Sequence, residues 1–186
     1  MRTIADHILD ISANSTSAGA TKVWLEIVEN TAHATFVFTV QDNGRGMPSS
    51  VRDQVFDPFF TTRPHEIRRF GLGLPFLQEN AEMTGGSVQL KSEPGAGTTV
   101  QATFHTDNID CLPVGDIAST FFALLVSDLS VQWNISRTRD DLAYTVATED
   151  LMKVFTLDEL SDPEAQMLLL EYLRGQEQTV CGSEKL

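Results

Sequence analysis

A strand that ends in a carboxylate is the feature that most constrains how this chain can fold. Asp42 follows an alternating segment and shares its parity with three apolar residues, Phe36, Phe38 and Val40. A strand that runs through Asp42 therefore directs its carboxylate to the apolar face of the sheet. Because an unpaired buried carboxylate is costly in free energy, we expect a hydrogen-bond donor to meet it.

The turn after this strand is rich in glycine. Gly44 and Gly46 have no side chains, so a flat ring or another backbone segment can come close to Asp42. A ligand amino group is one donor that such a turn can admit, which points to recognition of a purine nucleotide. An Asp-Asn-Gly turn also closes ordinary hairpins, so these residues alone leave both interpretations open.

The charge of the chain limits its partners. Its 186 residues include 26 acidic and 13 basic side chains, which gives a net charge of -13. This charge repels nucleic acid and anionic membranes, and we expect neither as a partner. A polyanionic ligand would need local backbone N–H groups, a metal ion and a few basic side chains. Arg63, Arg68 and Arg69 form such a local basic cluster.

Composition and cysteine spacing predict a globular cytoplasmic protein. Hydrophobic residues make up 41% of the chain. The longest apolar run, Phe121 to Val126, is too short to span a membrane. The N-terminus does not resemble a signal peptide, because an acid and a histidine interrupt it early. Cys111 and Cys181 lie far apart without a CxxC pattern, so we expect neither a disulfide framework nor a cysteine metal site.

Periodicity predicts two units, the first over residues 1–106. It begins with a helix over residues 3–18 and a hairpin over residues 23–40. A short helix capped by Ser49 or Ser50 follows. A second helix from Leu74, stopped by paired glycines, and two further strands complete this unit.

The second unit is predicted to be a small α+β extension over residues 116–186, after a linker over residues 107–115. It contains a helix from Ile117, a hairpin around residues 139–141, and two final helices. Thr148 is a candidate cap for the first of these, and Asp162 begins the last. We predict an interaction or regulatory role for the extension, with core packing as the alternative for its apolar residues.

Three groups of polar residues and glycines could carry chemistry. The first helix places Asp10 and Asn14 on one face, where an amide oxygen can ligate Mg2+ and a carboxylate can orient or deprotonate water. Gly71 and Gly73 precede the second helix, whose free N–H groups favour phosphate. The hydroxyl of Thr98, on the last strand of the first unit, could help to satisfy Asp42. A solvated helix face, helix packing and β-propensity are the respective alternatives.

The order of these pieces carries a family resemblance. Residues 3–105 resemble the GHKL superfamily of gyrase-like, heat-shock-90-like, histidine-kinase and mismatch-repair ATPases. Similarity lies in the N box (Asp10 to Thr21), the G1 box (Asp42 to Met47), the F box of histidine kinases (Phe56 to Arg63), their G2 box (Gly71 to Leu74) and the glycine-threonine turn (Gly95 to Thr99).

This resemblance implies a Bergerat-type fold, an α/β two-layer sandwich with helices on one face of a mixed sheet. It implies ATP and Mg2+ as cofactors, with Asp42 on the adenine amino group, Thr98 supporting that contact and Asn14 ligating Mg2+. Residues 61–70 would form the ATP lid. The remaining nucleotide contacts would come from Gly44, Gly46, Met47, Phe60, Arg63, Gly71, Leu72, Gly73 and Leu74.

The chain also departs from the family pattern. Arg69 and Phe70 replace the first two residues of the Gly-Thr-Gly-Leu-Gly-Leu sequence common in kinases. Asp10 stands where gyrase-like members have a general-base glutamate, so it is a candidate base for hydrolysis. No helical hairpin with a phosphoacceptor histidine precedes the domain, so we expect no autophosphorylation by this chain alone.

Three functions are compatible with these observations. The first is a Mg-ATP-binding domain in two-component-type signalling that supplies phosphoryl transfer or ATP-dependent control to a separate protein partner. The second is a noncatalytic ATP-sensing or anti-sigma-like binding module. The third is a gyrase-like or mismatch-repair-like ATPase, which the net charge and the kinase-like G2 box disfavour. Whether ATP is hydrolysed and what the oligomeric state is are left open by the sequence.

Overall fold

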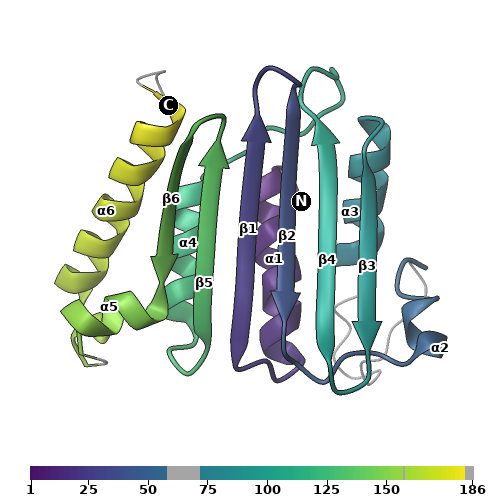
Figure 1. Ribbon diagram of the computed structural model, residues 1–186. Coiled ribbons are helices and arrows are strands. Elements are labelled where there is room, and N and C mark those ends of the chain that lie inside the picture. The colour runs from purple at the N-terminus through teal and green to yellow at the C-terminus, as the bar shows by residue number, and fades with distance from the viewer. Residues whose placement is uncertain (58–71, 157, 183–186) are drawn as a thin grey trace.

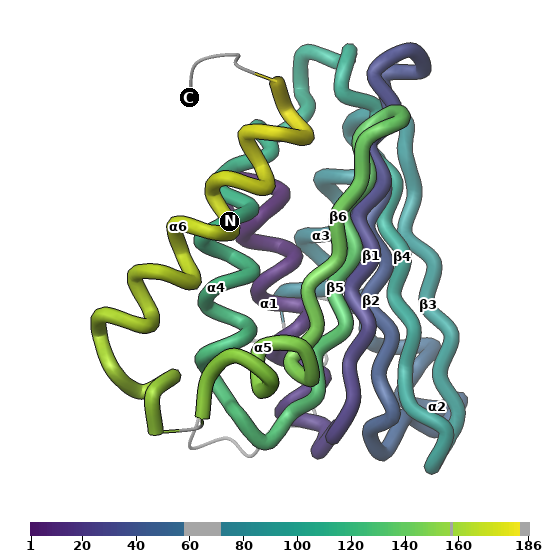
Figure 2. The backbone as a smooth tube through the Cα atoms, turned by 60° about the vertical axis from the view of Figure 1, so that its left-hand side comes forward, coloured from purple at the N-terminus to yellow at the C-terminus, as the bar shows by residue number. Residues whose placement is uncertain are grey.

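The protein forms one mixed sheet with its longer helices packed on one face (Figures 1 and 2). The computed structural model describes residues 1–57, 72–156 and 158–182. The helices of this part are α1 (Ile4–Ser17), α2 (Ser49–Arg52), α3 (Gly73–Met83), α4 (Ile117–Ser127), α5 (Thr148–Val154), η1 (Glu159–Ser161) and α6 (Pro163–Cys181). The strands are β1 (Lys22–Asn30), β2 (Thr35–Asp42), β3 (Ser87–Glu93), β4 (Gly97–His105), β5 (Gln132–Arg139) and β6 (Leu142–Ala147).

The six strands lie in the order β3-β4-β2-β1-β5-β6. β1 pairs in parallel with β5, and the other neighbours pair antiparallel. Helices α1, α3, α4 and α6 lie on the same side of the sheet in the side view (Figure 2), and α2 lies beside the edge strand β3 (Figure 1). The mixed sheet with one helical layer confirms the predicted fold class.

Helix α1 forms where the isoleucine periodicity predicted it. Thr3 caps its start through a capping box, because its hydroxyl accepts from the Asp6 N–H while the Asp6 carboxylate accepts from the Thr3 N–H. Ile4, Ile8 and Ile11 are buried against the sheet. The helix therefore has a fixed start and a fixed apolar face, which position its polar residues.

The core lies between the sheet and the helices. In β2, Phe36, Phe38 and Val40 are buried, as the alternation predicted. The rings of Phe38 and Phe104 stack with their centroids 6.4 Å apart. In the second unit, Trp133, Ile135 and Val146 continue this apolar layer under α4 and α6.

The second unit adds its strands to the same sheet, which the sequence did not show. β5 lies beside β1 over its whole length, from Lys22 opposite Gln132 to Glu29 opposite Arg139. Residues 107–115 contain no helix or strand, yet their carbonyl groups at Pro113 and Val114 accept from the first N–H groups of α1. The division into two domains remains a prediction.

Two predicted helix caps were wrong. Neither Ser49 nor Ser50 caps α2, which begins after Pro48 without a side-chain cap and ends at Arg52. The Thr148 hydroxyl accepts a hydrogen bond from the Trp133 N–H at 3.0 Å instead of capping α5. Its position at the end of β6 explains this, because a backbone N–H of the neighbouring strand comes within reach. Asp162 caps α6 as predicted, through the Glu164 N–H.

A buried ionic network joins the sheet to α6. Arg137 is 1% exposed, and its guanidinium contacts the carboxylate of Glu29 on β1 and, at 3.5 Å, that of Glu177 on α6. Tyr144 donates to Glu177 at 2.5 Å, and the Arg137 guanidinium lies 5.6 Å from the centroid of the Phe36 ring. Burial disfavours the charged form of Arg137, but the two carboxylates outweigh it and raise the pKa of the guanidinium.

Candidate functional site

The Asp42 carboxylate lies at the end of β2 and is met by three donors. It is 7% exposed. Its Oδ2 accepts from the Ser15 hydroxyl at 3.0 Å, and its Oδ1 accepts from the backbone N–H groups of Gly44 at 2.8 Å and Thr98 at 3.3 Å. These donors meet the need that the sequence predicted. A carboxylate has about four acceptor positions, so one further donor can still be accepted there.

Ser15 is a member of this site that the sequence interpretation missed. It is buried on α1, directly after Asn14, and faces Asp42. The available signal was its spacing, because Ser15 follows Ile4, Ile8 and Ile11 at helical intervals on the buried side of the helix.

Thr98 meets Asp42 through its backbone and not through its hydroxyl, which corrects the predicted contact. The two residues lie opposite each other in the pairing of β2 with β4. The Thr98 hydroxyl instead lies 2.9 Å from the Ser92 hydroxyl, which comes from the neighbouring strand β3. The sequence could not distinguish these two contacts, because both need only that Thr98 lie opposite Asp42.

The glycine turn after Asp42 is held on two sides. Arg45 donates its N–H to the Ala18 carbonyl at the end of α1, and its own carbonyl accepts from Gly95 in the β3–β4 turn. Gly46 has a φ of 63°, and a Cβ there would lie 1.9 Å from the Glu93 carbonyl oxygen. A side chain at this position would therefore separate the turn from β3.

Gly44 and Met47 also lie at this turn. A Cβ on Gly44 would lie 2.9 Å from Asp42 Oδ1, so a side chain there would crowd the carboxylate. Met47 donates its N–H to the Ser92 hydroxyl at 2.9 Å. The turn, the carboxylate and the end of β3 are thus one connected structure.

Asp10 lies against the start of α3. A Cβ on Gly73 would lie 1.9 Å from Asp10 Oδ2, so this approach needs glycine. Leu72 is the N-cap residue of α3, and Leu74 packs against the core. Helix α1 therefore makes two contacts at the site. Ser15, near its C-terminal end, contacts Asp42, and Asp10, about one and a half turns earlier in the helix, contacts the start of α3. Asn14, half-buried, lies between these two contacts.

Several predicted residues are outside the part of the chain that the structure describes. These are Phe60, Arg63, Arg68, Arg69, Phe70, Gly71 and the predicted lid over residues 61–70. Their roles stay predictions.

His7 is a buried neutral histidine next to the site. It is 0% exposed, and its Nε2 lies 3.2 Å from Asn80 Nδ2 on α3. Because an amide nitrogen can only donate, Nε2 is the acceptor and the ring proton is on Nδ1. Burial, followed by the charge of the N-terminal amino group, lowers the pKa of His7 to about 4, and Asp6 opposes this shift.

The lowered pKa of His7 predicts that the folded protein loses stability in acid. Its pKa is about 6.5 in the unfolded chain and about 4 in the folded protein, so between these values the unfolded state binds more protons. The free energy of unfolding therefore falls as the pH drops from 6.5 to 4, by about 3 kcal/mol for this residue. Urea unfolding of the wild type and of His7→Gln across this range measures it. A wild type and variant with parallel pH profiles would contradict the prediction.

The described residues contain no group of three His, Cys, Asp or Glu side chains placed to hold a metal ion. An Mg2+ ion bound with a nucleotide takes one or two protein oxygens and completes its coordination with phosphates and water. The amide oxygen of Asn14 is a suitable protein ligand of this kind.

Comparison with known proteins identifies the class. The family described as histidine kinase-, DNA gyrase B- and HSP90-like ATPase matches residues 1–108, more than half of the chain. The chain belongs to this family. It therefore carries an ATP-binding domain of the histidine-kinase-like type, as in the GHKL superfamily.

Curated relatives include sensor kinases. Sensor kinase CckA of Brucella abortus is 44% identical over 64 residues, which are 34% of this chain and 7% of CckA. Sensor protein kinase WalK of Staphylococcus haemolyticus is 27% identical over 113 residues, which are 59% of this chain and 18% of WalK. The matches thus cover less than a fifth of either relative.

A solved structure shares the fold. The N-terminal domain of a DNA repair protein aligns with a TM-score of 0.54 and 11% identity, over 79% of this chain and 52% of that one. At this identity the likeness concerns the fold alone. In the described part of the chain, no helix has the length and apolar character needed to cross a membrane.

Proposed function

We propose that this chain binds Mg-ATP beside Asp42 and supplies phosphoryl transfer or ATP-dependent control to a separate protein in a signalling system. The observation that carries the proposal is the connection made by α1. This helix contacts the buried Asp42 through Ser15 and the start of α3 through Asp10, with Asn14 between. The expected cytoplasmic location belongs to the same proposal.

Asp42 is the proposed adenine contact. Its carboxylate has acceptor capacity beyond the three protein donors, and the amino group of adenine is a donor. The absence of a side chain at Gly44 keeps the carboxylate uncrowded, while Gly46 keeps the turn against β3. Ser15 would hold the carboxylate in place through Oδ2.

The phosphates are proposed to lie toward the start of α3. The first turn of this helix presents N–H groups without intrahelical partners, and the helix dipole favours negative charge there. Asn14 would ligate Mg2+, which when bound would offset the phosphate charge. Asp10 is proposed to orient water in the same region, and Arg63 to contact phosphate from the lid.

The phosphoryl acceptor is proposed to be on another protein. Of the four histidines, three lie in the described part of the chain. His7 is fully buried, and burial lowers its pKa to about 4. His105 pairs with Thr35 at the opposite end of β4 from Thr98, roughly 24 Å away along a strand, and His33 lies in the turn at that far end. These positions do not suit transfer from a nucleotide beside Asp42.

Labelled ATP distinguishes the possible outcomes. Purified protein is incubated with Mg2+ and ATP carrying a γ-phosphate label, with and without candidate acceptor proteins. Movement of the γ-phosphoryl group to an acceptor, with release of ADP, is the expected result. Free phosphate without an acceptor would indicate an ATPase, in which Asp10→Asn should lose turnover and keep binding. Binding without either product would indicate a sensing module, and acid-labile label on His7 would overturn the separate acceptor.

Asn14 is expected to act through the metal ion. Asn14→Ala should weaken ATP binding about tenfold in the presence of Mg2+ and much less in EDTA. The reason is that the proposed contact between the Asn14 amide oxygen and Mg2+, about as strong as a hydrogen bond, exists only when Mg2+ is present. Isothermal titration in both buffers measures the difference. Ser17→Ala, on the exposed side of the same helix, is the matched control. Equal losses for Asn14→Ala in both buffers would show a structural role only.

A further inference from the structure

The outer face of α6 exposes large apolar side chains. Met167, Leu168 and Tyr172 are 59%, 57% and 49% exposed, while Ala165, Leu169 and Leu173 on the other side of the helix are buried. At 100° per residue, the exposed face also includes Glu164, Glu171 and Gly175. We call these six residues the α6 outer face: Glu164, Met167, Leu168, Glu171, Tyr172 and Gly175.

Gly175 makes this face unusual. Glycine inside a helix is destabilising relative to alanine, and α6 continues beyond it to Cys181. A Cβ on Gly175 would have no atom within 4 Å, so packing inside this protein does not require glycine there. Because Gly175 has no side chain, the helix surface beside the exposed apolar residues permits close approach of a segment of another protein.

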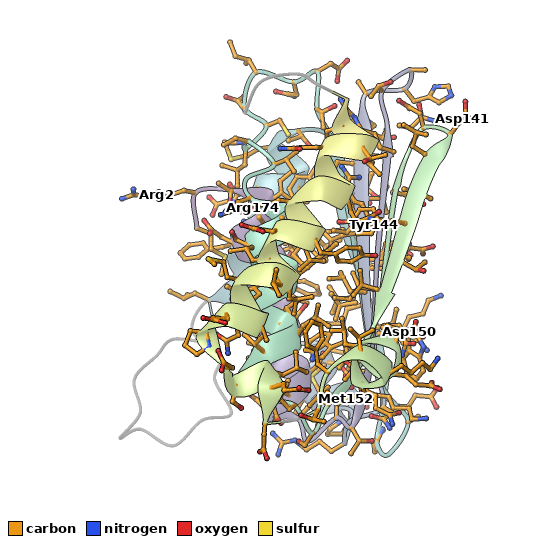
Figure 3. All side chains as sticks on the ribbon, turned by 90° about the vertical axis from the view of Figure 1, so that its left-hand side faces the viewer. Arg2, Asp141, Tyr144, Asp150, Met152 and Arg174 are labelled. Atoms are coloured by element: carbon orange, nitrogen blue, oxygen red, sulfur yellow. The ribbon has the colours of Figure 1, made fainter. Side chains whose placement is uncertain are left out.

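The helix that carries this face is firmly attached to the sheet. Glu177 accepts from Tyr144 on β6 and pairs with buried Arg137, and Arg139 donates to the Cys181 carbonyl at 2.7 Å. Figure 3 shows α6 in front, with Arg174 directed away from the sheet and Tyr144 between β6 and the helix. The outer face is therefore presented in a fixed orientation, which lowers the entropic cost of binding.

The surroundings of this face are strongly acidic. From residue 158 to residue 175, the exposed charged side chains are five acids and one arginine, Arg174. The acids are Asp158, Glu159, Asp162, Glu164 and Glu171. A surface of this kind attracts cationic partners and repels anionic membranes and nucleic acid.

We propose that the α6 outer face binds a basic amphipathic helix of a partner protein. Leucine-type residues of that helix would pack on Leu168, Tyr172 and Gly175, and its Lys and Arg side chains would face Glu164, Glu171 and the acids near the start of α6. A second copy of this chain is disfavoured, because two subunits of net charge -13 would bring like charges together. The surface belongs to the second unit and does not depend on ATP binding.

The contact is expected to be transient. One face of one helix offers much less than the roughly 800 Å² per partner of a stable complex. Electrostatic attraction then sets a fast association rate and a marked dependence on salt. An affinity in the micromolar range follows from this size and charge.

A designed peptide tests the proposal without nucleotide. The probe is a helical peptide of about five turns with leucine on one face and lysine on the other, and the control peptide has glutamate in place of lysine. Binding is measured by fluorescence anisotropy, and its location by chemical-shift mapping on the full chain. The variant is Leu168→Ser with Tyr172→Ser. The matched control is Met83→Ser with Leu142→Ser, which changes two apolar residues of similar exposure elsewhere.

The expected result is a dissociation constant raised about tenfold or more by the α6 variant and unchanged by the control variant. The lysine peptide should bind more tightly than the glutamate peptide, and Glu164→Gln with Glu171→Gln should reduce the salt dependence. Equal binding to both variants, absence of binding, or shifts located elsewhere would overturn the proposal. Dimerisation that the α6 variant abolishes would also overturn it, since a second copy would then be the occupant.

Discussion

Asp42→Asn is expected to weaken ATP binding by about 100-fold or more. Asparagine has nearly the same shape, but it replaces one carboxylate oxygen with an amide donor. An amide nitrogen in place of Oδ1 would face the N–H donors of Gly44 and Thr98, so the nitrogen would take the place of Oδ2, where the Ser15 hydroxyl can rotate to accept from it. An adenine amino group on that side would then meet a second donor instead of an acceptor. Isothermal titration with ATP measures the loss.

Two variants control for this result. Asp141→Asn changes an exposed carboxylate in the β5–β6 turn and should leave ATP affinity unchanged. Ser15→Ala keeps the Asp42 carboxylate but removes one of its donors, so it should reduce affinity by about tenfold or less. Full ATP affinity in a folded Asp42→Asn variant would show that this carboxylate is structural.

Arg137→Met is expected to lower the free energy of unfolding by about 3–5 kcal/mol. Methionine keeps much of the packing volume but removes the cation between the carboxylates of Glu29 and Glu177. Both carboxylates are mostly buried; Glu29 would keep its 3.1 Å ion pair with Arg139, but Glu177 would lose the cation beside it. For a chain of this length, the melting temperature should fall by about 10 °C.

Urea unfolding measures this effect. Arg174→Met removes an exposed arginine from the same helix that carries Glu177, and it should change stability by about 0.5 kcal/mol or less. A change below about 1 kcal/mol in Arg137→Met would contradict the account, because it would mean that the buried network contributes no more than an exposed ion pair.

Local patterns predicted most of the elements. The isoleucines of α1, the alternation of β2 and the glycines after α3 each depend on residues close in sequence, and the helices and strands lie where these patterns place them. The capping errors have the opposite cause. Whether the Thr148 hydroxyl caps α5 or bonds to Trp133 depends on a neighbouring strand, which a local pattern cannot include.

The long-range pairing of the second unit was beyond local patterns. β5 lies in parallel beside β1 although about a hundred residues separate them, and parallel strands carry no turn that would mark their partners. The ionic network was not predicted, although a signal for it was present. Arg137 shares its parity with buried Trp133 and Ile135, which indicates that it faces the core and needs a carboxylate.

Periodicity predicted on which side of their elements the main residues of the candidate site lie, and not their exact contacts. The sequence indicated that Asp42 faces the core and that Asn14 and Asp10 share a helix face. It did not indicate Ser15 as a donor, nor that Thr98 uses its backbone. Hydrogen-bond partners depend on the precise positions of atoms in neighbouring elements. Periodicity determines only the side of an element on which a residue lies.

Nucleotide selectivity tests the central claim most directly. The wild-type protein is titrated with ATP and with GTP in Mg2+ buffer by isothermal calorimetry. ATP should bind saturably, and GTP should bind about 100-fold more weakly or not at all, because guanine presents a carbonyl oxygen to Asp42 where adenine presents an amino group. Equal affinity for the two nucleotides, or no saturable binding of ATP, would contradict the assignment of Asp42 as the adenine contact.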